Sequence, residues 1–214
     1  MPGKEMIVVL SGASGSGKTS LAQRLKEMVP GIEKTISYTT RTPRADERDG
    51  VSYHFVDETE FQARIKRKAF VEWARVHGNL YGTSSEQITG WLNAGLDVVC
   101  DIDVQGGKAI RKLYGEQSVL VFILPPSWEI LEKRLRGRGT EGDDVIRRRL
   151  ERAREEHASA HLYDYLVVND DFSTAAAAVS DIVRAERLRT RRAISKLPEG
   201  LVAAPRKSRA APRK

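Results

Sequence analysis

The chain has 214 residues, of which 40% are hydrophobic and 30% charged, and its formal net charge at pH 7 is +7. This composition is typical of a soluble globular protein, and no apolar run approaches the ~20 residues that a membrane-spanning helix requires. Cys100 is the only cysteine, which excludes an intramolecular disulfide and a thiolate-rich metal site. No export signal is visible, so a reducing, cytoplasmic setting is expected.

Short runs rich in Val, Ile and Leu predict strands that are buried on both faces. They lie at residues 6–10, 97–103, 118–124 and 165–170. Helical patterns separate them, as at residues 20–28, 127–138 and 144–161. This alternation predicts an α/β fold with a parallel sheet flanked by helices. Residues 36–83 break the rhythm with short alternating pieces, which predicts a mixed β insertion.

The most specific motif follows the first predicted strand. Residues 12–19 read GASGSGKT and match G-x-x-x-x-G-K-[ST] at every fixed position, with a helical pattern directly after them. Glycines let successive backbone N–H groups turn toward an anion, and the following helix adds its positive end. The motif therefore predicts an ATP phosphate site in which Lys18 reaches the phosphates and Thr19 binds Mg²⁺. Its members are Gly12, Ala13, Ser14, Gly15, Ser16, Gly17, Lys18 and Thr19.

A second glycine pattern occurs at residues 137–142 and matches the dinucleotide fingerprint G-x-G-x-x-G. It follows a helical pattern and not a strand, so a Rossmann site is rejected. We interpret it as a flexible basic loop that closes over phosphates. The arginines around it are Arg134, Arg136, Arg138, Arg147, Arg148 and Arg149.

Asp101 and Asp103 end the second predicted strand. A strand-end aspartate holds Mg²⁺ directly or through water in phosphate-loop enzymes. A buried carboxylate also needs a partner, so a packing role is the weaker interpretation. The two residues are expected to share a face, and the pattern leaves open which of them contacts the metal.

A succession of motifs in the insertion carries a family resemblance. The segments SYTTRTPR, GVSYHF, FVEWA and GNLYGTS are followed by DIDVQG, RGRGTE, RRRL and VVND. In this order they resemble guanylate kinase, from about Ile7 to Arg187. The resemblance implies a P-loop NTPase-type parallel sheet with a small mixed β insertion for GMP, a short lid, and phosphoryl transfer from ATP to GMP with Mg²⁺.

The resemblance also implies a division of the chain. A guanylate-kinase-like domain would span residues 5–190. The rest, at 191–214, lies outside the family pattern, and its Pro, Ala and basic residues predict a basic, disordered tail. Within the domain, the core would comprise about 5–36, 86–134 and 150–190, with the GMP-binding insertion at 37–85 and the lid at 135–149.

The residues implied to bind GMP fall into two groups. Arg41, Arg44, Tyr53 and Tyr81 would hold its phosphate, while Glu72, Ser37 and Thr83 would face the guanine. Asp101 is counted with these GMP-binding residues and, with Thr19 and Asp103, among the ligands of Mg²⁺. Asn169 would lie near the adenine of ATP. The residues implied to act in catalysis are Lys18, Arg41, Arg138 and Arg149.

Three alternatives stay open. The chain could be another nucleoside-monophosphate kinase, although Glu72 with Ser37 argues against it, or a related module that binds protein ligands without catalysis. The third is weak contact between nucleic acid and the tail, which from Lys196 onward has six basic residues against Glu199 alone. A solvated tail without a specific partner is the simpler interpretation of these charges. The sequence does not distinguish a monomer from a homo-oligomer.

Overall fold

The computed structural model describes residues 5–76, 78–137, 142–198 and 201. In this part of the chain a five-stranded sheet has the order β2-β7-β1-β8-β9, and every neighbouring pair is parallel. The predicted α/β class and parallel sheet are confirmed. The strands are β1 (Ile7–Ser11), β2 (Ile32–Lys34), β7 (Asp97–Asp101), β8 (Ser118–Leu124) and β9 (Tyr165–Val168).

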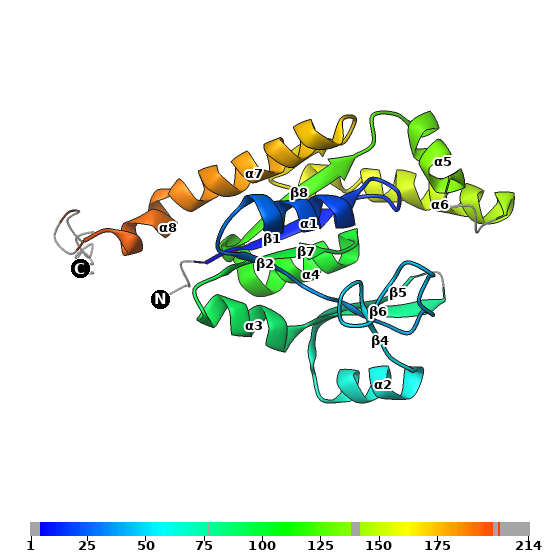
Figure 1. Ribbon diagram of the computed structural model, residues 1–214, viewed down its shortest axis with the longest axis horizontal. Helices are drawn as coiled ribbons and strands as arrows, with labels where there is room; N and C mark the ends of the chain where they lie inside the picture. Colours follow the sequence, from blue (N-terminus) through cyan, green and yellow to red (C-terminus); the bar gives the residue numbers. More distant parts are fainter. Residues whose placement is uncertain (1–4, 77, 138–141, 199–200, 202–214) are drawn as a thin grey trace, which may run out of the picture.

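Helices cover both faces of this sheet (Figure 1). α1 (Lys18–Met28) and α7 (Phe172–Leu188) pack on one face, and α3 (Ser85–Asn93) and α4 (Val104–Tyr114) on the other. α5 (Trp128–Arg136) and α6 (Asp143–His157) pack against each other through a third apolar cluster. Short 3-10 turns, η1 (Gly115–Gln117) and η2 (Ala160–Leu162), precede β8 and β9. None of the described helices is long and apolar enough to cross a membrane.

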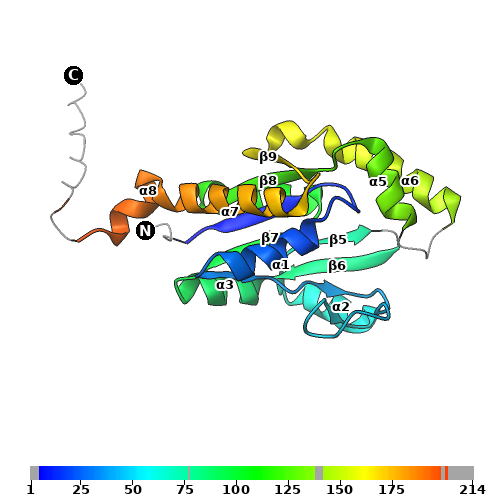
Figure 2. The same ribbon diagram turned by 45° about the horizontal axis from the view of Figure 1, so that its top comes forward.

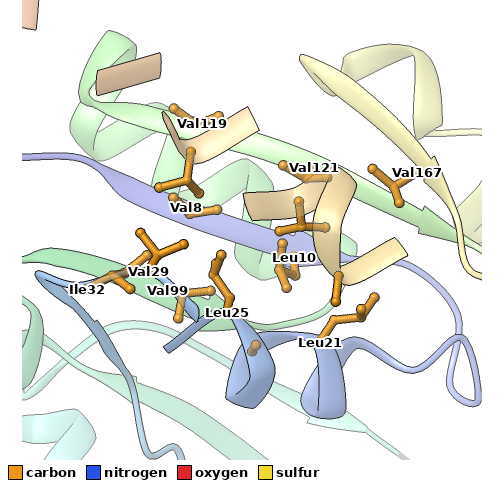
Figure 3. Close-up of a cluster of buried hydrophobic side chains, with 14 of the residues drawn as sticks. Val8, Leu10, Leu21, Leu25, Val29, Ile32, Val99, Val119, Val121 and Val167 are labelled. Atoms are coloured by element: carbon orange, nitrogen blue, oxygen red, sulfur yellow. The ribbon is translucent and has the colours of Figure 1, made fainter. Parts of the chain in front are cut away.

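The alternation of side chains along β1 explains why it is apolar from Ile7 to Leu10 without a break. Val8 and Leu10 pack against α1 and α7, as Figure 3 shows with Leu21 and Leu25 of α1. Ile7 and Val9 point to the opposite face and join the cluster beneath α3 and α4. Because both faces are covered, every position of the strand is buried and none has to be polar.

The insertion forms a second sheet of mixed direction, with the order β4-β3-β6-β5 among the described strands. β3 pairs with β4 in parallel, and the remaining pairs are antiparallel. α2 (Glu58–Lys66) covers this sheet through Phe61, which is fully buried against Phe70. The strands are β3 (Tyr38–Thr39), β4 (His54–Phe55), β5 (Phe70–Val76) and β6 (Asn79–Ser84).

The helical chain continues beyond the predicted start of the tail at residue 191. After α7 come α8 (Thr190–Ala193) and the turn η3 (Ile194–Lys196). Arg192 is only 4% exposed, since it forms an ion pair with Glu186, which also accepts a hydrogen bond of 2.7 Å from the Tyr165 hydroxyl. The predicted start of the tail is therefore too early in the sequence. A run of basic residues is usually exposed to solvent, whereas Arg192 has a buried carboxylate partner. The predicted tail from 202 lies outside the described residues.

Candidate active site

A cavity of about 1340 Å³ lies where the glycine-rich loop, the small sheet and α6 face one another. α5, α6 and the small sheet lie at one end of the molecule in both views, and α8 lies at the other (Figures 1 and 2). Side chains from the loop, α1, the end of β2, β5, β6, the end of β7 and α6 line the cavity. The carboxyl ends of the parallel strands thus open into it, where ligands of open α/β sheets usually bind.

Glycine is required at two positions of the loop by close contacts. Gly12 has φ 140°, and a Cβ there would lie 2.3 Å from the Ile123 carbonyl oxygen. Gly17 has φ 94°, and a Cβ there would lie 2.2 Å from the Asn169 amide nitrogen. Any other residue would therefore displace the loop from β8 or from Asn169.

Two cations contact the loop from different helices. Lys18 Nζ, at the start of α1, donates to the carbonyl oxygens of Gly12 and Ala13 at 2.6 and 2.9 Å. Arg149 Nη1, on α6, donates to Ser14 Oγ at 3.1 Å. The structure thus brings together the predicted loop lysine and one predicted lid arginine, as an anion-binding site requires.

Asn169 lies behind the loop and does not line the cavity. Its side chain is 5% exposed, and Nδ2 donates to the Ser16 carbonyl oxygen at 2.7 Å. The structure therefore gives Asn169 a contact that the sequence did not predict, one that holds the loop backbone. Its contact with adenine stays a prediction.

Replacing Asn169 by alanine is expected to lower the free energy of unfolding by about 1–3 kcal/mol, because the buried Ser16 carbonyl would lose its donor. Urea denaturation of the variant measures this change. Asn93→Ala, at an exposed position of α3, is the matched control and should leave the stability nearly unchanged. Equal stability of the two variants would contradict a stabilising role for the hydrogen bond between Asn169 and the Ser16 carbonyl.

Across the cavity, two arginines surround a carboxylate. Arg41 Nη2 donates to both carboxylate oxygens of Glu47, at 2.7 and 2.9 Å, and Arg44 Nη1 lies 3.9 Å from the same group. The guanidinium of Arg41 also lies 5.4 Å from the ring centroid of Tyr53, which packs edge-on against Tyr81. The bidentate geometry shows that this pocket already binds an anionic group of this chain.

The Tyr53 hydroxyl stays protonated in this pocket. Burial raises the pKa of Tyr53 well above its ordinary value, and the nearby Asp101 carboxylate raises it further. A protonated hydroxyl can donate a hydrogen bond to an anion, so Tyr53 complements the two arginines.

Glu72, on β5, faces the cavity from the small sheet. Burial raises its pKa from 4.5 to about 7, although the hydrogen bond from the Thr83 hydroxyl acts in the opposite direction. Thr83 is fully buried behind it, and Ser37 lines the same cavity. Gly106 lets α4 approach, since a Cβ there would lie 3.1 Å from the Glu72 carboxylate. The result is a carboxylate with little water around it, suited to accept hydrogen bonds from a ligand.

The two predicted aspartates have different surroundings. β7 ends at Asp101, so the predicted strand 97–103 was two residues too long. Asp103 instead caps α4, and its Oδ1 accepts from the Gly106 N–H at 3.0 Å. Its Oδ2 lies 3.3 Å from Arg152 Nη2, whereas Asp101 Oδ1 lies 3.5 Å from Lys34 Nζ. The capping preference of aspartate ended the strand earlier than its apolar pattern suggested.

Thr19, Asp101 and Asp103 line the same cavity and supply the oxygen donors that Mg²⁺ prefers. Among the described residues, no group of three or more His, Cys, Asp and Glu side chains could hold a metal ion. This donor set nevertheless fits Mg²⁺, which is usually bound by one or two carboxylates together with substrate phosphates.

Most of the predicted site residues meet in this one cavity. Those that line it are Gly12, Ser14, Gly15, Gly17, Lys18, Thr19, Ser37, Arg41, Arg44, Tyr53, Glu72, Tyr81, Asp101, Asp103 and Arg149. Others are buried beside it, namely Ala13, Ser16, Thr83 and Asn169. Arg138 lies outside the described residues. Cavity residues that the sequence did not single out include Lys34, Glu47, Arg152 and Glu156.

A glycine-rich loop that opens a helix on a parallel sheet, facing an arginine-lined pocket, defines a P-loop nucleotide-binding protein. Comparison with known proteins narrows this class. The family model "Guanylate kinase" matches residues 4–186, so the chain belongs to the guanylate kinase family.

Individual relatives agree with this assignment. The guanylate kinase of Neisseria gonorrhoeae is 47% identical over 189 residues, which are 88% of this chain and 92% of that protein. The guanylate kinase of Geobacter metallireducens is 42% identical over 194 residues, covering 91% of this chain and 95% of the relative. The crystal structure of guanylate kinase from Anaplasma phagocytophilum has a TM-score of 0.76 and 34% identity, covering 89% of this chain and 90% of that one.

Proposed function

We propose that the chain transfers the γ-phosphoryl group of ATP to GMP, giving ADP and GDP, in cytoplasmic purine metabolism. The observation that carries this proposal is a single cavity with a phosphate loop on one side and Glu72, Arg41 and Arg44 on the other. Membership of the guanylate kinase family supports the same reaction. Both halves of the cavity are needed, because a phosphate loop by itself does not select an acceptor.

The donor half would hold ATP. The backbone N–H groups of the loop and the positive end of α1 favour the β- and γ-phosphates. Lys18 now donates to loop carbonyls, and from that position its ammonium would follow the transferring group. Arg149 would add a charge from α6, and Arg138 is proposed beside it on the family resemblance.

The acceptor half would hold GMP. Arg41 and Arg44 would bind its phosphate in the place where Glu47 now provides the anion, with Tyr53 and Tyr81 as hydroxyl donors. Glu72 would accept hydrogen bonds from guanine N1–H and the 2-amino group, and adenine has neither donor at these positions. An unpaired buried carboxylate would therefore disfavour AMP.

Catalysis in this arrangement needs no general base. The second pKa of a phosphate monoester is about 6, so the attacking oxygen of GMP is largely ionised at neutral pH. The chain would hold the two phosphates in line and offset their repulsion with Lys18, Arg41 and Arg149. Thr19, Asp101 and Asp103 would hold Mg²⁺, which neutralises charge on the donor phosphates.

A coupled assay of ADP production tests the proposal. The full chain is supplied with ATP and Mg²⁺, and GMP, AMP, CMP, UMP or no acceptor is added in parallel. We expect turnover with GMP and background rates with the others. Turnover with another nucleotide would overturn the role of Glu72, and no turnover with any acceptor would favour a binding module without catalysis.

A further inference from the structure

Lys34 is a charged residue at a position where the fold calls for an apolar one. It is the last residue of β2 and lies opposite Val99 of β7. Val99 and Ile32, two residues earlier on β2, belong to the apolar cluster beneath α1 and α7. Strand alternation puts Lys34 on that same face, and its side chain is only 9% exposed. A nearly buried lysine is unfavourable unless a partner compensates its charge.

That partner is Asp101, which follows Val99 by two residues and therefore shares its face. Lys34 Nζ lies 3.5 Å from Asp101 Oδ1, and the Asp101 side chain is also 9% exposed. A second contact, from Nζ to the Thr35 carbonyl oxygen, is 3.4 Å long. Both distances exceed the ~2.8 Å of a strong charge-assisted hydrogen bond. The ammonium is thus near two acceptors without a short bond to either.

The pair belongs to the wall of the proposed active-site cavity. Lys34 and Asp101 both line it, together with the loop residues on one side and the Tyr53 pocket on the other. The Asp101 charge also acts on the Tyr53 hydroxyl, so the carboxylate lies near the proposed phosphate pocket. Other carboxylates of the cavity have arginine partners: Glu47 pairs with Arg41, and Asp103 and Glu156 pair with Arg152. For Asp101, the cation that offsets its charge toward an entering phosphate dianion is Lys34.

We propose that Lys34 is a positioning residue for the acceptor: its ammonium holds and neutralises Asp101, so that the phosphate of GMP can approach this carboxylate. The proposal rests on the proposed acceptor site and adds to it a cation from the core sheet. It concerns the phosphate, because Lys34 and Asp101 line the same cavity as Tyr53, on whose hydroxyl the Asp101 charge acts, and Tyr53 belongs to the proposed phosphate pocket.

Calorimetric titration of GMP and of guanosine, without ATP or Mg²⁺, tests this role. Lys34→Met removes the charge and keeps the length of the side chain. We expect the Kd for GMP to rise about tenfold, since an uncompensated carboxylate then faces the phosphate, and the Kd for guanosine to stay unchanged. Lys26→Met is the matched control: this lysine is half-exposed on α1 and pairs with Glu33, the neighbour of Lys34.

A double-mutant cycle with Asp101→Asn separates the proposed mechanism from a general packing effect. If Lys34 acts through Asp101, Lys34→Met should raise the Kd for GMP only about threefold or less in the Asp101→Asn background. Thermal unfolding of each variant checks the fold, and Lys34→Gln repeats the test if Lys34→Met unfolds.

The outcomes are distinct. Unchanged GMP binding, equal losses for GMP and guanosine, or the same loss in both backgrounds would each overturn the role of Lys34. If the unmodified chain bound no GMP at all, the proposed acceptor site itself would be wrong.

Discussion

Replacing Lys18 by methionine is expected to lower kcat for phosphoryl transfer to GMP by on the order of 10³, because a preorganised cation at the transferring group is lost. The side chain is well placed for this role, since it starts at the first residue of α1 and reaches Gly12 and Ala13 of the loop. The coupled assay measures kcat, and circular dichroism with thermal unfolding verifies the fold.

Lys26→Met serves as the control for Lys18→Met, because it removes a lysine from the same helix at a site outside the cavity. Its kcat should stay within about twofold of the original chain, as expected of a surface pair that contributes little. Turnover by Lys18→Met at the level of this control would remove Lys18 from the proposed donor site.

The second large effect is expected for Glu72→Gln, which should lower activity with GMP and raise the stability of the fold. Glutamine offers one acceptor and one donor where guanine presents two donors, so kcat/KM for GMP should fall by on the order of 10²–10³, with KM for ATP unchanged. Parallel titrations of GMP and ATP in the coupled assay separate the two substrates. A kcat/KM for GMP equal to that of the original chain would contradict the base-reading role.

The same substitution should stabilise the fold at alkaline pH. The pKa of Glu72 is raised from 4.5 to about 7 in the folded chain, mainly by burial, so folding disfavours its ionised form. Stability linked to this group is fully present below pH 4.5 and is lost as the pH rises through about 7. At pH 8, Glu72→Gln is expected to increase the free energy of unfolding by about 3 kcal/mol. Urea denaturation at pH 8 and pH 5 measures it.

The gain should largely vanish at pH 5, where Glu72 is already protonated in the folded chain. This difference between the two pH values is the internal control, because a general packing improvement would persist at both. A variant that is no more stable at pH 8 than the original chain would show that ionisation of Glu72 carries no penalty. Such a penalty is typical of a site kept ready for a ligand.

The fold was predictable where an apolar run was long enough to indicate a strand buried on both of its faces. The strand containing Val8 and Leu10 is of this kind, and its place at the centre of the sheet follows from such burial. β2 was not predicted, because it has three residues and two of them, Glu33 and Lys34, are charged. Only the pairing with β7 makes it a strand, and a local pattern does not contain that contact.

The site was predictable where a motif has fixed spacing, as at the phosphate loop. Arg149 and Asn169 were named as site residues, but the particular contacts that they make with the loop were not predicted, because these contacts join distant parts of the chain. Asn169 contacts Ser16 across 153 positions of sequence, and Arg149 contacts Ser14 across 135. Glu47 carried a local signal that could have been used, since it follows Arg44 by three residues and accepts its backbone N–H at 2.8 Å.

Glu47 also affects the affinity with which the pocket around Arg41 could bind a phosphate. Because both oxygens of its carboxylate already accept from Arg41, a phosphate that bound here as proposed would exchange one anion for another and would not fill a bare cationic pocket. The net affinity for phosphate would then be the difference between two strong interactions, and so smaller than the phosphate–arginine interaction alone. When the product leaves, the same carboxylate is at hand to take its place. In the proposed reaction, Glu47 would therefore limit how long a phosphorylated product stays bound at Arg41.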